Sequence, residues 1–236
     1  MAMRQEACAA AGEALPIETT APTPDSTVRE GEMEGALQVI GEVGYRAASV
    51  RSVLEYSGGH RKQFYEHFES LEDCFAQAYE AWAKRLVLSV LEAAVSVEGW
   101  RAGVRAGLMK LFQTVVERPA IGRALFIEVH VAGGKALATH DEAVDRVADA
   151  LDSVRNEIGP DDAPPSQTGL FVVGGIEVCV CDALADGDPN RIWDALPELM
   201  RLITVSYLDA QTAAEEAEAA RAAVEEVRAK LEGGSR

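Results

Sequence analysis

Three adjacent polar side chains, Arg61, Lys62 and Gln63, stand at the start of a short predicted helix. Guanidinium, ammonium and amide groups can hydrogen-bond to base edges and to phosphate oxygens, so the triplet suits contact with the major groove of DNA. The first turn of a helix also carries the positive end of the helix dipole, which favours an approaching phosphate. Phe64 and Phe68, four residues apart, share one face and are predicted to anchor this helix in a small core.

A first helix is predicted over residues 28–43, with apolar side chains at helical spacing. Thr27 and Glu30 have the spacing of a capping box at its start. Gly44 stands where a left-handed residue can end the helix. The preceding residues, 1–27, are rich in Ala, Pro, Thr and Glu without a clear period, and we expect a disordered tail there.

A second helix is predicted to begin after Ser49, which can cap it. Ser57-Gly58-Gly59 then provides a flexible break before a third helical run, 61–68. Three short helices, the last two joined by a turn that contains Gly, are typical of a helix-turn-helix unit, here residues 28–69. The third helix would be held from below by apolar residues of the first two: Leu37, Ile40, Val50, Val53 and Leu54.

The segment EVGYRAASVRSVLEYSGGHRKQFYEHFESLEDCFAQAY resembles the DNA-binding segment of the tetracycline-repressor-like (TetR) family. The resemblance rests on a specific series of short motifs: Gly44-Tyr45, Ser49, Ser57-Gly58, Phe64-Tyr65-Glu66-His67-Phe68 and Ser70-Leu71-Glu72. It implies an all-α fold in which a three-helix DNA-binding domain precedes a helical domain for ligand binding and dimerisation.

The resemblance also implies a role in DNA binding for one group of side chains. Contacts to bases or nearby phosphates fall to Arg61, Lys62 and Gln63, backbone positioning to Ser49, Tyr65 and His67, and further phosphate contacts to Arg46 and Arg51. For Tyr65 and His67, local packing or capping is the alternative.

The chain departs from the family pattern at the turn before the third helix and at two further places. Gly59-His60 replaces the usual Val and Ser or Thr cap, and loss of such a cap costs about 0.5–2 kcal/mol. Leu71 stands where the family often has a phosphate-contacting Lys, and the first helix begins with the acidic run REGEME. These changes predict a looser turn and a weaker electrostatic affinity for DNA.

The remaining sequence predicts a larger helical domain over 70–210. Ser70 and Asp73 have the spacing of a helix start, and Gly, Pro or polar breaks separate the runs 71–97, 99–117, 119–132, 138–158, 167–185 and 190–210. A helical extension, 211–236, carries a heptad stripe of Ala213, Ala217, Ala220, Val224, Val227 and Leu231. Both a docked terminal helix and a partner-binding zipper fit this stripe.

A small-molecule pocket in the larger domain is expected from the family resemblance, which also implies a homodimer through 167–185 and 190–210. Gly174-Gly175 can allow close helix approach across the dimer axis or within one chain. Aromatic or polar residues on apolar helices are the candidate ligand-binding side chains: Tyr79, Trp82, Phe112, Phe126, Glu128, His130, Phe171 and Glu177. For His130 a core or surface role is the alternative, and Glu177 can equally face the dimer partner.

Composition narrows the classes of protein. A net charge of −17 argues against coating of nucleic acid by bulk electrostatics, although residues 44–68 hold four basic and two acidic side chains. The four cysteines are scattered, and no metal-ligand, nucleophile or phosphate-loop spacing occurs, so we expect no metal, no cofactor and no enzyme activity. The N-terminus lacks the pattern of a secretory signal, and the most apolar stretch, 170–185, contains Glu177 and Asp182.

These patterns together predict a cytoplasmic, dimeric DNA-binding regulator, a repressor released from a palindromic operator by a small hydrophobic or amphipathic molecule. The alternative is a ligand-binding or protein-interaction module whose helix-turn-helix has weak or lost DNA affinity.

Overall fold

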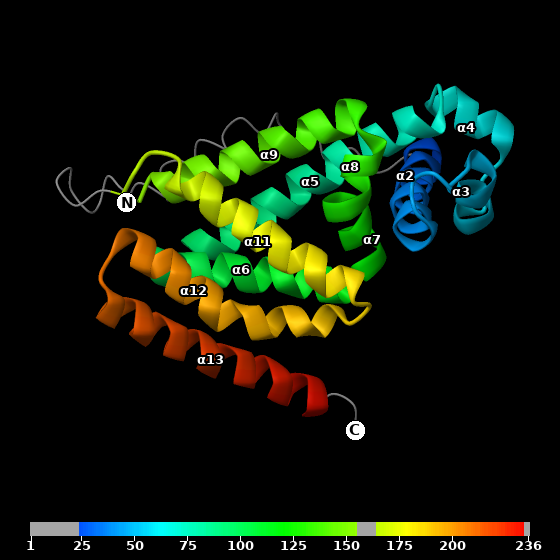
Figure 1. Ribbon diagram of the computed structural model, residues 1–236. Coiled ribbons are helices and arrows are strands. Elements are labelled where there is room, and N and C mark those ends of the chain that lie inside the picture. Colours follow the sequence, from blue (N-terminus) through cyan, green and yellow to red (C-terminus); the bar gives the residue numbers. More distant parts are fainter. Residues whose placement is uncertain (1–23, 155–163, 234–236) are drawn as a thin grey trace. The chain divides into compact units, whose positions relative to one another are not determined.

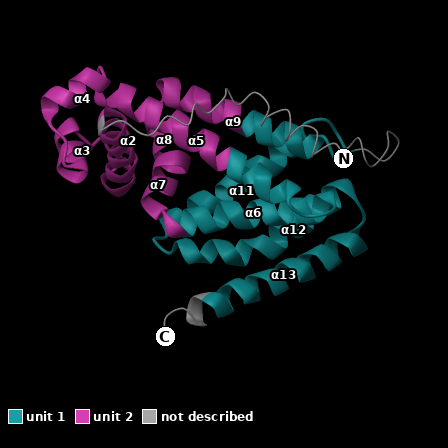
Figure 2. Cartoon of the chain, turned by 180° about the vertical axis from the view of Figure 1, so that it is seen from behind, with its two compact units in different colours: residues 1–12, 88–116, 144–236 teal, residues 13–87, 117–143 magenta. Residues whose placement is uncertain are grey.

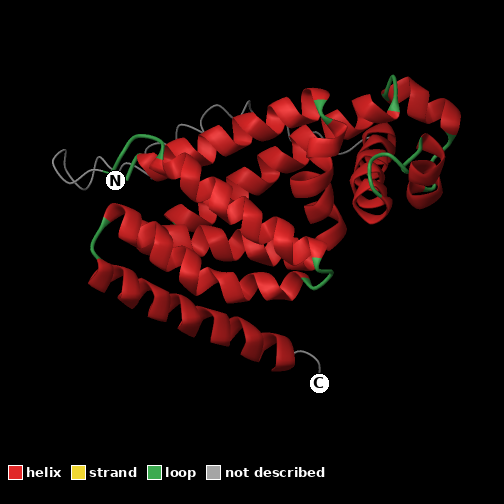
Figure 3. Cartoon of the chain, viewed as in Figure 1, coloured by secondary structure: helices red, strands yellow, loops and turns green. Residues whose placement is uncertain are grey.

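The protein is helical throughout the residues that the computed structural model describes, 24–154 and 164–233 (Figure 3). The described residues contain no β-strand, which confirms the all-α prediction. Most of the predicted tail lies outside the described residues. Helix α2 runs from Pro24 to Val43, so the predicted start of the first helix at Thr27 is wrong by about one turn. Pro suits a first helical position because its missing N–H would have no helical acceptor there.

The described residues form two compact units (Figure 2). The head unit comprises residues 24–87 and 117–143, and the body unit comprises 88–116, 144–154 and 164–233. Helices α5 (Leu71–Val95) and α9 (Gly134–Asp152) each contribute residues to both units.

The head unit contains the three predicted short helices and a second group of helical segments (Figure 1). The first group is α2, α3 (Val50–Ser57) and α4 (Arg61–His67), followed by the start of α5. The second group is α7 (Pro119–Arg123), η1 (Ala124–Glu128), α8 (Val129–Ala132) and the start of α9. The predicted helix 119–132 is therefore interrupted, because η1 has the wider π-helical hydrogen-bonding pattern.

The predicted caps set the geometry of the helix-turn-helix. Gly44 has φ +87° after α2, and Gly58 has φ +72° after α3, both in the left-handed region. The Ser49 hydroxyl accepts the backbone N–H of Ser52 and forms a capping box with it. Ser70 likewise accepts the N–H of Asp73 at 3.1 Å where α5 begins. These four helix ends were correctly predicted.

A small apolar core holds the three short helices together. Leu37, Ile40, Val53 and Phe64 are 0% exposed and Phe68 is 2% exposed, as predicted for the underside of the third helix. The rings of Phe64 and Phe68 lie with their centroids 5.3 Å apart. Burial of aromatic and aliphatic side chains of this size stabilises a fold by about 1.5–3 kcal/mol each, so α4 has one face that is firmly fixed and one that is free.

In the body unit, α6 (Trp100–Glu117) packs closely on the end of α5. A Cβ added to Gly103 would lie 2.7 Å from the carbonyl oxygen of Ala94, so only Gly allows this approach. Aromatic pairs join α6 to α12 (Ile192–Tyr207): Trp100 with Tyr207, and Phe112 with Trp193. Helix α12 is shorter at both ends than the predicted helix 190–210. Helix α9 begins four residues before its predicted start at 138.

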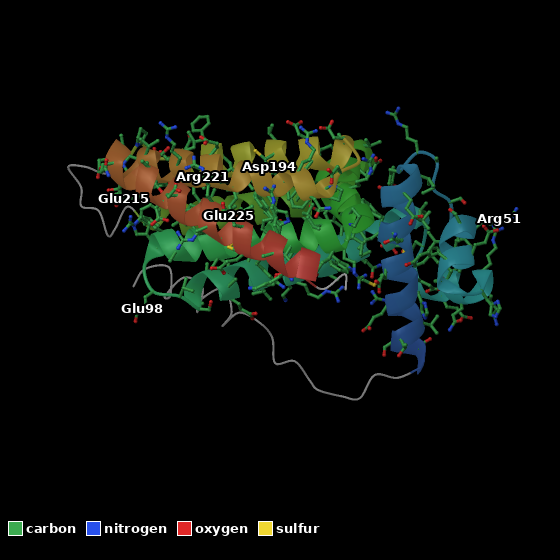
Figure 4. The ribbon with its side chains drawn as sticks, turned by 90° about the horizontal axis from the view of Figure 1, so that it is seen from below. Arg51, Glu98, Asp194, Glu215, Arg221 and Glu225 are labelled. Atoms are coloured by element: carbon green, nitrogen blue, oxygen red, sulfur yellow. The ribbon has the colours of Figure 1, made fainter. Side chains whose placement is uncertain are left out.

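Helix α13 (Ala210–Gly233) packs along α12 in the same chain, so the structure shows the docked form of the C-terminal stripe. Ala213, Ala217, Ala220 and Val224 are buried. Ion pairs between the helices join Arg228 to Asp194 and Arg221 to Glu198; Figure 4 shows Arg221 and Asp194 on these neighbouring helices. The side chain of Leu231 lies outside the described residues.

Helix α11 (Thr168–Ala185) is the one helix in the described part of the chain whose length and apolarity would allow it to cross a membrane. Core helices of soluble proteins meet the same criteria. Part of α11 is buried within the body unit, including Val172, Ile176, Val180 and Leu184, and the helix packs against α12. The structure therefore places α11 as a core helix of this unit.

Candidate nucleic-acid interface

An open groove lies between α3 and α4, and two basic side chains of the helix-turn-helix, Arg51 and Arg61, line it. Its lining includes Ser49, Arg51, Glu55, Arg61 and Tyr65. Phe64 and Val53 are buried beneath the two helices, so the polar side chains are supported by a fixed apolar layer. Figure 4 shows Arg51 on the outer side of α3, away from α2.

The cations of this surface are exposed, and their partners hold them only weakly. Arg51 pairs with Glu55 at 2.8 Å, with 88% and 63% of the two side chains exposed. Lys62 pairs with Glu66 at 3.7 Å, and the Arg61 guanidinium lies 5.7 Å from the centroid of the Tyr65 ring. Pairs as exposed as these contribute little to stability, so a phosphate can replace the carboxylates as partner.

The other predicted DNA-binding side chains divide into outward and inward groups. Arg46 is exposed in the turn before α3, and Tyr65 is 47% exposed. Gln63 is half-buried on α4. Ser49 is exposed, but its hydroxyl caps α3, so the structure favours backbone positioning for this residue.

His67 points inward, and both of its ring nitrogens have partners within the protein. Nδ1 lies 2.5 Å from Glu32 Oε2, and Nε2 lies 3.0 Å from Asp25 Oδ1. Its side chain is 7% exposed. The hydrogen bond to Glu32 raises the pKa of His67 above its ordinary value, burial opposes this shift, and Asp25 adds to it. His67 therefore ties the end of α4 to α2 instead of facing DNA, which agrees with the packing alternative.

Glu32 explains the unusual Gly59 in the turn before α4. Its side chain is fully buried, and Oε1 has no hydrogen-bond partner among the described residues. A Cβ on Gly59 would lie 3.2 Å from this oxygen and 3.0 Å from Leu54 Cδ2. The place of the missing Val side chain is thus filled, which argues against the looser turn expected from the sequence. His60 makes no side-chain capping bond, as its type predicts.

Solved structures resemble this chain over most of its length. The fatty acid degradation regulator FadR from Bacillus halodurans matches with a TM-score of 0.65 and 13% identity, covering 74% of this chain and 96% of that one. FadR from Bacillus subtilis in complex with stearoyl-CoA gives 0.63 and 13%, with 73% and 96% covered. TylP, a TetR regulator from Streptomyces fradiae, gives 0.59 and 17%, with 86% and 99% covered. The chain has the fold of TetR-family transcriptional regulators. No protein-family model and no curated protein sequence matches it.

Five of the predicted ligand-binding residues of this TetR fold lie in the head unit. The Tyr79 hydroxyl is buried and lies 3.2 Å from the Leu125 carbonyl oxygen and 2.9 Å from His140 Nδ1. Trp82 is half-buried beneath the guanidinium groups of Arg85 and Arg118. Phe126 is half-buried in η1, Glu128 is 8% exposed and His130 is exposed on α8.

The other three predicted ligand-binding residues lie in the body unit. Phe112 is fully buried against Trp193, so it is a core residue of this unit. Phe171 is 79% exposed on α11 and lines no interior space in the single chain. Glu177 is half-buried on the same helix. The eight residues are thus divided between the two units, five in the head unit and three in the body unit, and their part in ligand binding stays a prediction.

Sequence reasoning missed the contacts of Glu32 and the contact of Glu128 with the turn before α3. Each contacts a residue far along the chain: Glu32 contacts His67, and Glu128 accepts the backbone N–H of Tyr45. The only sequence signal for a buried Glu32 is its place among the apolar positions of α2, after Val28 and before Met33 and Leu37. An acidic residue on such a face is a candidate for a buried pair.

Proposed function

We propose that this protein is a cytoplasmic, ligand-responsive transcriptional regulator that binds DNA through α3 and α4 and has no catalytic step. One observation carries the proposal: Arg61, Lys62 and Tyr65 stand exposed on α4, while Phe64 and Phe68 fix the opposite face of the same helical run. A helix held in this way can present its polar side chains to the major groove without losing its own packing. Arg46 and Arg51 add phosphate contacts at the side.

The DNA-binding unit is a homodimer formed through α11 and α12, which recognises a palindromic operator. Phe171 and Val178 on α11, and Leu202 and Val205 on α12, are large apolar side chains with 44–79% of their surface exposed in the single chain. Large apolar side chains that gather on one exposed surface mark association surfaces, and we propose that these four do so in the single chain. Gly174 and Gly175 have open space around them, which leaves room for close approach by a second chain.

The effector is a hydrophobic or amphipathic small molecule, and its binding releases the operator. The FadR structure from Bacillus subtilis holds stearoyl-CoA, an amphipathic molecule of this class. Stearoyl-CoA is therefore the first probe: we expect it to weaken DNA binding at micromolar concentration, and free CoA serves as the control that lacks the acyl chain.

DNA binding is tested by selecting bound fragments of the source genome with the full-length protein and titrating the best fragment. We expect the double variant Arg61→Ala/Lys62→Ala to bind that fragment at least about tenfold more weakly, because a bidentate contact to a base alone contributes about 1–3 kcal/mol. The matched control, Lys84→Ala/Arg146→Ala, removes two exposed cations from α5 and α9. Equal binding by both double variants would refute the assigned surface.

A second candidate function is a ligand-binding or protein-interaction module whose DNA affinity is weak. The observation that favours it is the neutralisation of Arg51 and Lys62 by Glu55 and Glu66 within the same helices, in a chain of net charge −17. Failure to retain any genomic fragment at low salt would support this candidate. Nanomolar binding of a selected fragment would exclude it.

A further inference from the structure

Glu128 makes a contact that none of the proposed roles uses. It lies at the end of η1, is 8% exposed, and its Oε2 accepts the backbone N–H of Tyr45 at 2.8 Å. Tyr45 follows Gly44, the left-handed residue that ends α2, and leads into the turn before α3. A carboxylate that accepts a backbone N–H away from water forms one of the stronger hydrogen bonds in proteins. The carboxylate thus points at this turn.

The segment that carries Glu128 is fixed to α2 just before the turn. A Cβ on Gly41 would lie 1.8 Å from the carbonyl oxygen of Ala120, so the backbones of α2 and α7 touch at this point. The Arg123 guanidinium donates from Nε to the Gly41 carbonyl oxygen at 3.1 Å. Backbone contact therefore holds α2, and the bond to Glu128 holds the chain that continues from α2 toward α3 and α4.

The π-helical turn makes the contact between Glu128 and Tyr45 sensitive to the hydrogen-bonding register of η1. A π-helical turn holds one residue more than an α-helical turn, and such turns often occur at functional sites. The Leu125 carbonyl oxygen, within η1, faces the hydroxyl of Tyr79 at 3.2 Å, and His140 Nδ1 lies 2.9 Å from the same hydroxyl. Buried polar contacts from α5 and α9 thus hold one part of η1, while Glu128 holds the turn. A return of η1 to an α-helical register would rotate Glu128 by about 100° and remove its carboxylate from Tyr45.

We infer that Glu128 is a positioning residue for the DNA-binding helices. Its carboxylate holds the turn 44–48, and with it α3 and α4, in a fixed relation to the segment 119–132. A change in the register of η1 releases the turn. The effect on DNA rests on the proposed function, whereas the contact itself is measurable without DNA.

The contact is tested by amide hydrogen exchange at Tyr45 in the full-length protein. We expect Glu128→Ala to raise the exchange rate of this amide about ten- to hundredfold, because it loses a hydrogen bond to a charged acceptor. Glu128→Gln keeps an oxygen acceptor and should stay within a few-fold of the wild type. Glu80→Ala removes an exposed glutamate of the same unit and is the matched control. An unchanged Tyr45 rate in Glu128→Ala, with Ile40 protected as in the wild type, would overturn the inference.

The positioning role is then tested on the DNA fragment selected by the wild type. We expect Glu128→Ala to bind it about tenfold more weakly and Glu128→Gln to recover most of the affinity. Faster Tyr45 exchange with unchanged DNA affinity would overturn the positioning role. If the wild type binds no DNA, the proposed function is refuted. In that case, faster amide exchange throughout α3 in Glu128→Ala would still support the positioning of α3 by Glu128.

Discussion

Two of the buried glutamates, Glu216 in the body unit and Glu32 in the head unit, are used in different ways. Glu216 on α13 is 9% exposed, and both of its oxygens have partners: Oε1 pairs with Arg101, and Oε2 pairs with Arg105. Glu32 on α2 is 0% exposed, with Oε2 bonded to His67 and Oε1 without a partner among the described residues. Both oxygens of the Glu216 carboxylate are thus satisfied, whereas one oxygen of the Glu32 carboxylate is not.

The partners also differ in their chemistry. Arginine keeps its charge at all physiological pH values, so the ion pairs of Glu216 hold α13 independently of pH in that range. Histidine titrates near neutral pH, so the link between Glu32 and His67 depends on pH. The comparison teaches that the polar contact between α4 and α2, which adds to their apolar core, depends on pH, whereas the polar contact between α13 and α6 does not.

The largest effect is expected from Glu216→Ala, which leaves Arg101 and Arg105 without their shared partner. Removing one member of a buried ion pair costs about 3–5 kcal/mol. The arginine side chains keep 38% and 22% exposure, so water compensates in part and we expect roughly 2–3 kcal/mol. Urea unfolding measures this loss. Glu225→Ala on the exposed face of α13 is the control (Figure 4). An equal loss of unfolding free energy in both variants would contradict a stabilising role of the Glu216 ion pairs.

A smaller effect is expected from Gly59→Val, which restores the side chain typical of the resembling family. The added Cβ would crowd Leu54 and Glu32 Oε1, so we expect a loss of about 1–3 kcal/mol from overpacking. In the background Glu32→Ala the same change should cost less, because the crowding carboxylate is gone. A double-mutant cycle by thermal unfolding measures the difference, and additive losses would show that Glu32 does not occupy the place of the Val side chain.

The smallest effect is a pH dependence of stability through His67. Because its pKa is raised in the folded protein, its stabilising contribution is fully present below the unfolded pKa of about 6.5 and is lost as the pH rises through the higher folded pKa. We expect the thermal midpoint of the wild type to fall with pH in this window, and His67→Gln to reduce that fall. His60→Gln, at an exposed histidine, is the control. An identical pH profile for wild type and His67→Gln would break the comparison.

Local signals in the sequence predicted much of the head unit. Gly44, Ser49, Gly58 and Ser70 act within a few residues of themselves, so their types are enough to place the helix ends. The start of α2 was misplaced because the Thr27–Glu30 spacing is typical of a capping box, whereas the helix already includes residues 24–27.

Contacts between distant residues could not be predicted in the same way. His67 meets Glu32 across 35 positions, and Glu128 meets Tyr45 across 83. Neither partner is marked by spacing, because the meeting depends on how α2 packs against α4 and against η1. The π-helical turn itself has no composition signal in ALFIE. The exposed cations of α3 and α4 were predictable because exposure follows from the amphipathic pattern, and the inward turn of His67 was not.

The most direct test of the account is the salt dependence of DNA binding by the wild type and by Arg61→Ala/Lys62→Ala. If the exposed face of α4 contacts phosphates, the slope of log K against log salt concentration should decrease in magnitude by about two in the double variant, with weaker binding at every salt concentration. Lys84→Ala/Arg146→Ala should keep the wild-type slope. An unchanged slope and affinity in Arg61→Ala/Lys62→Ala would contradict the assignment of α4 as the DNA-binding helix.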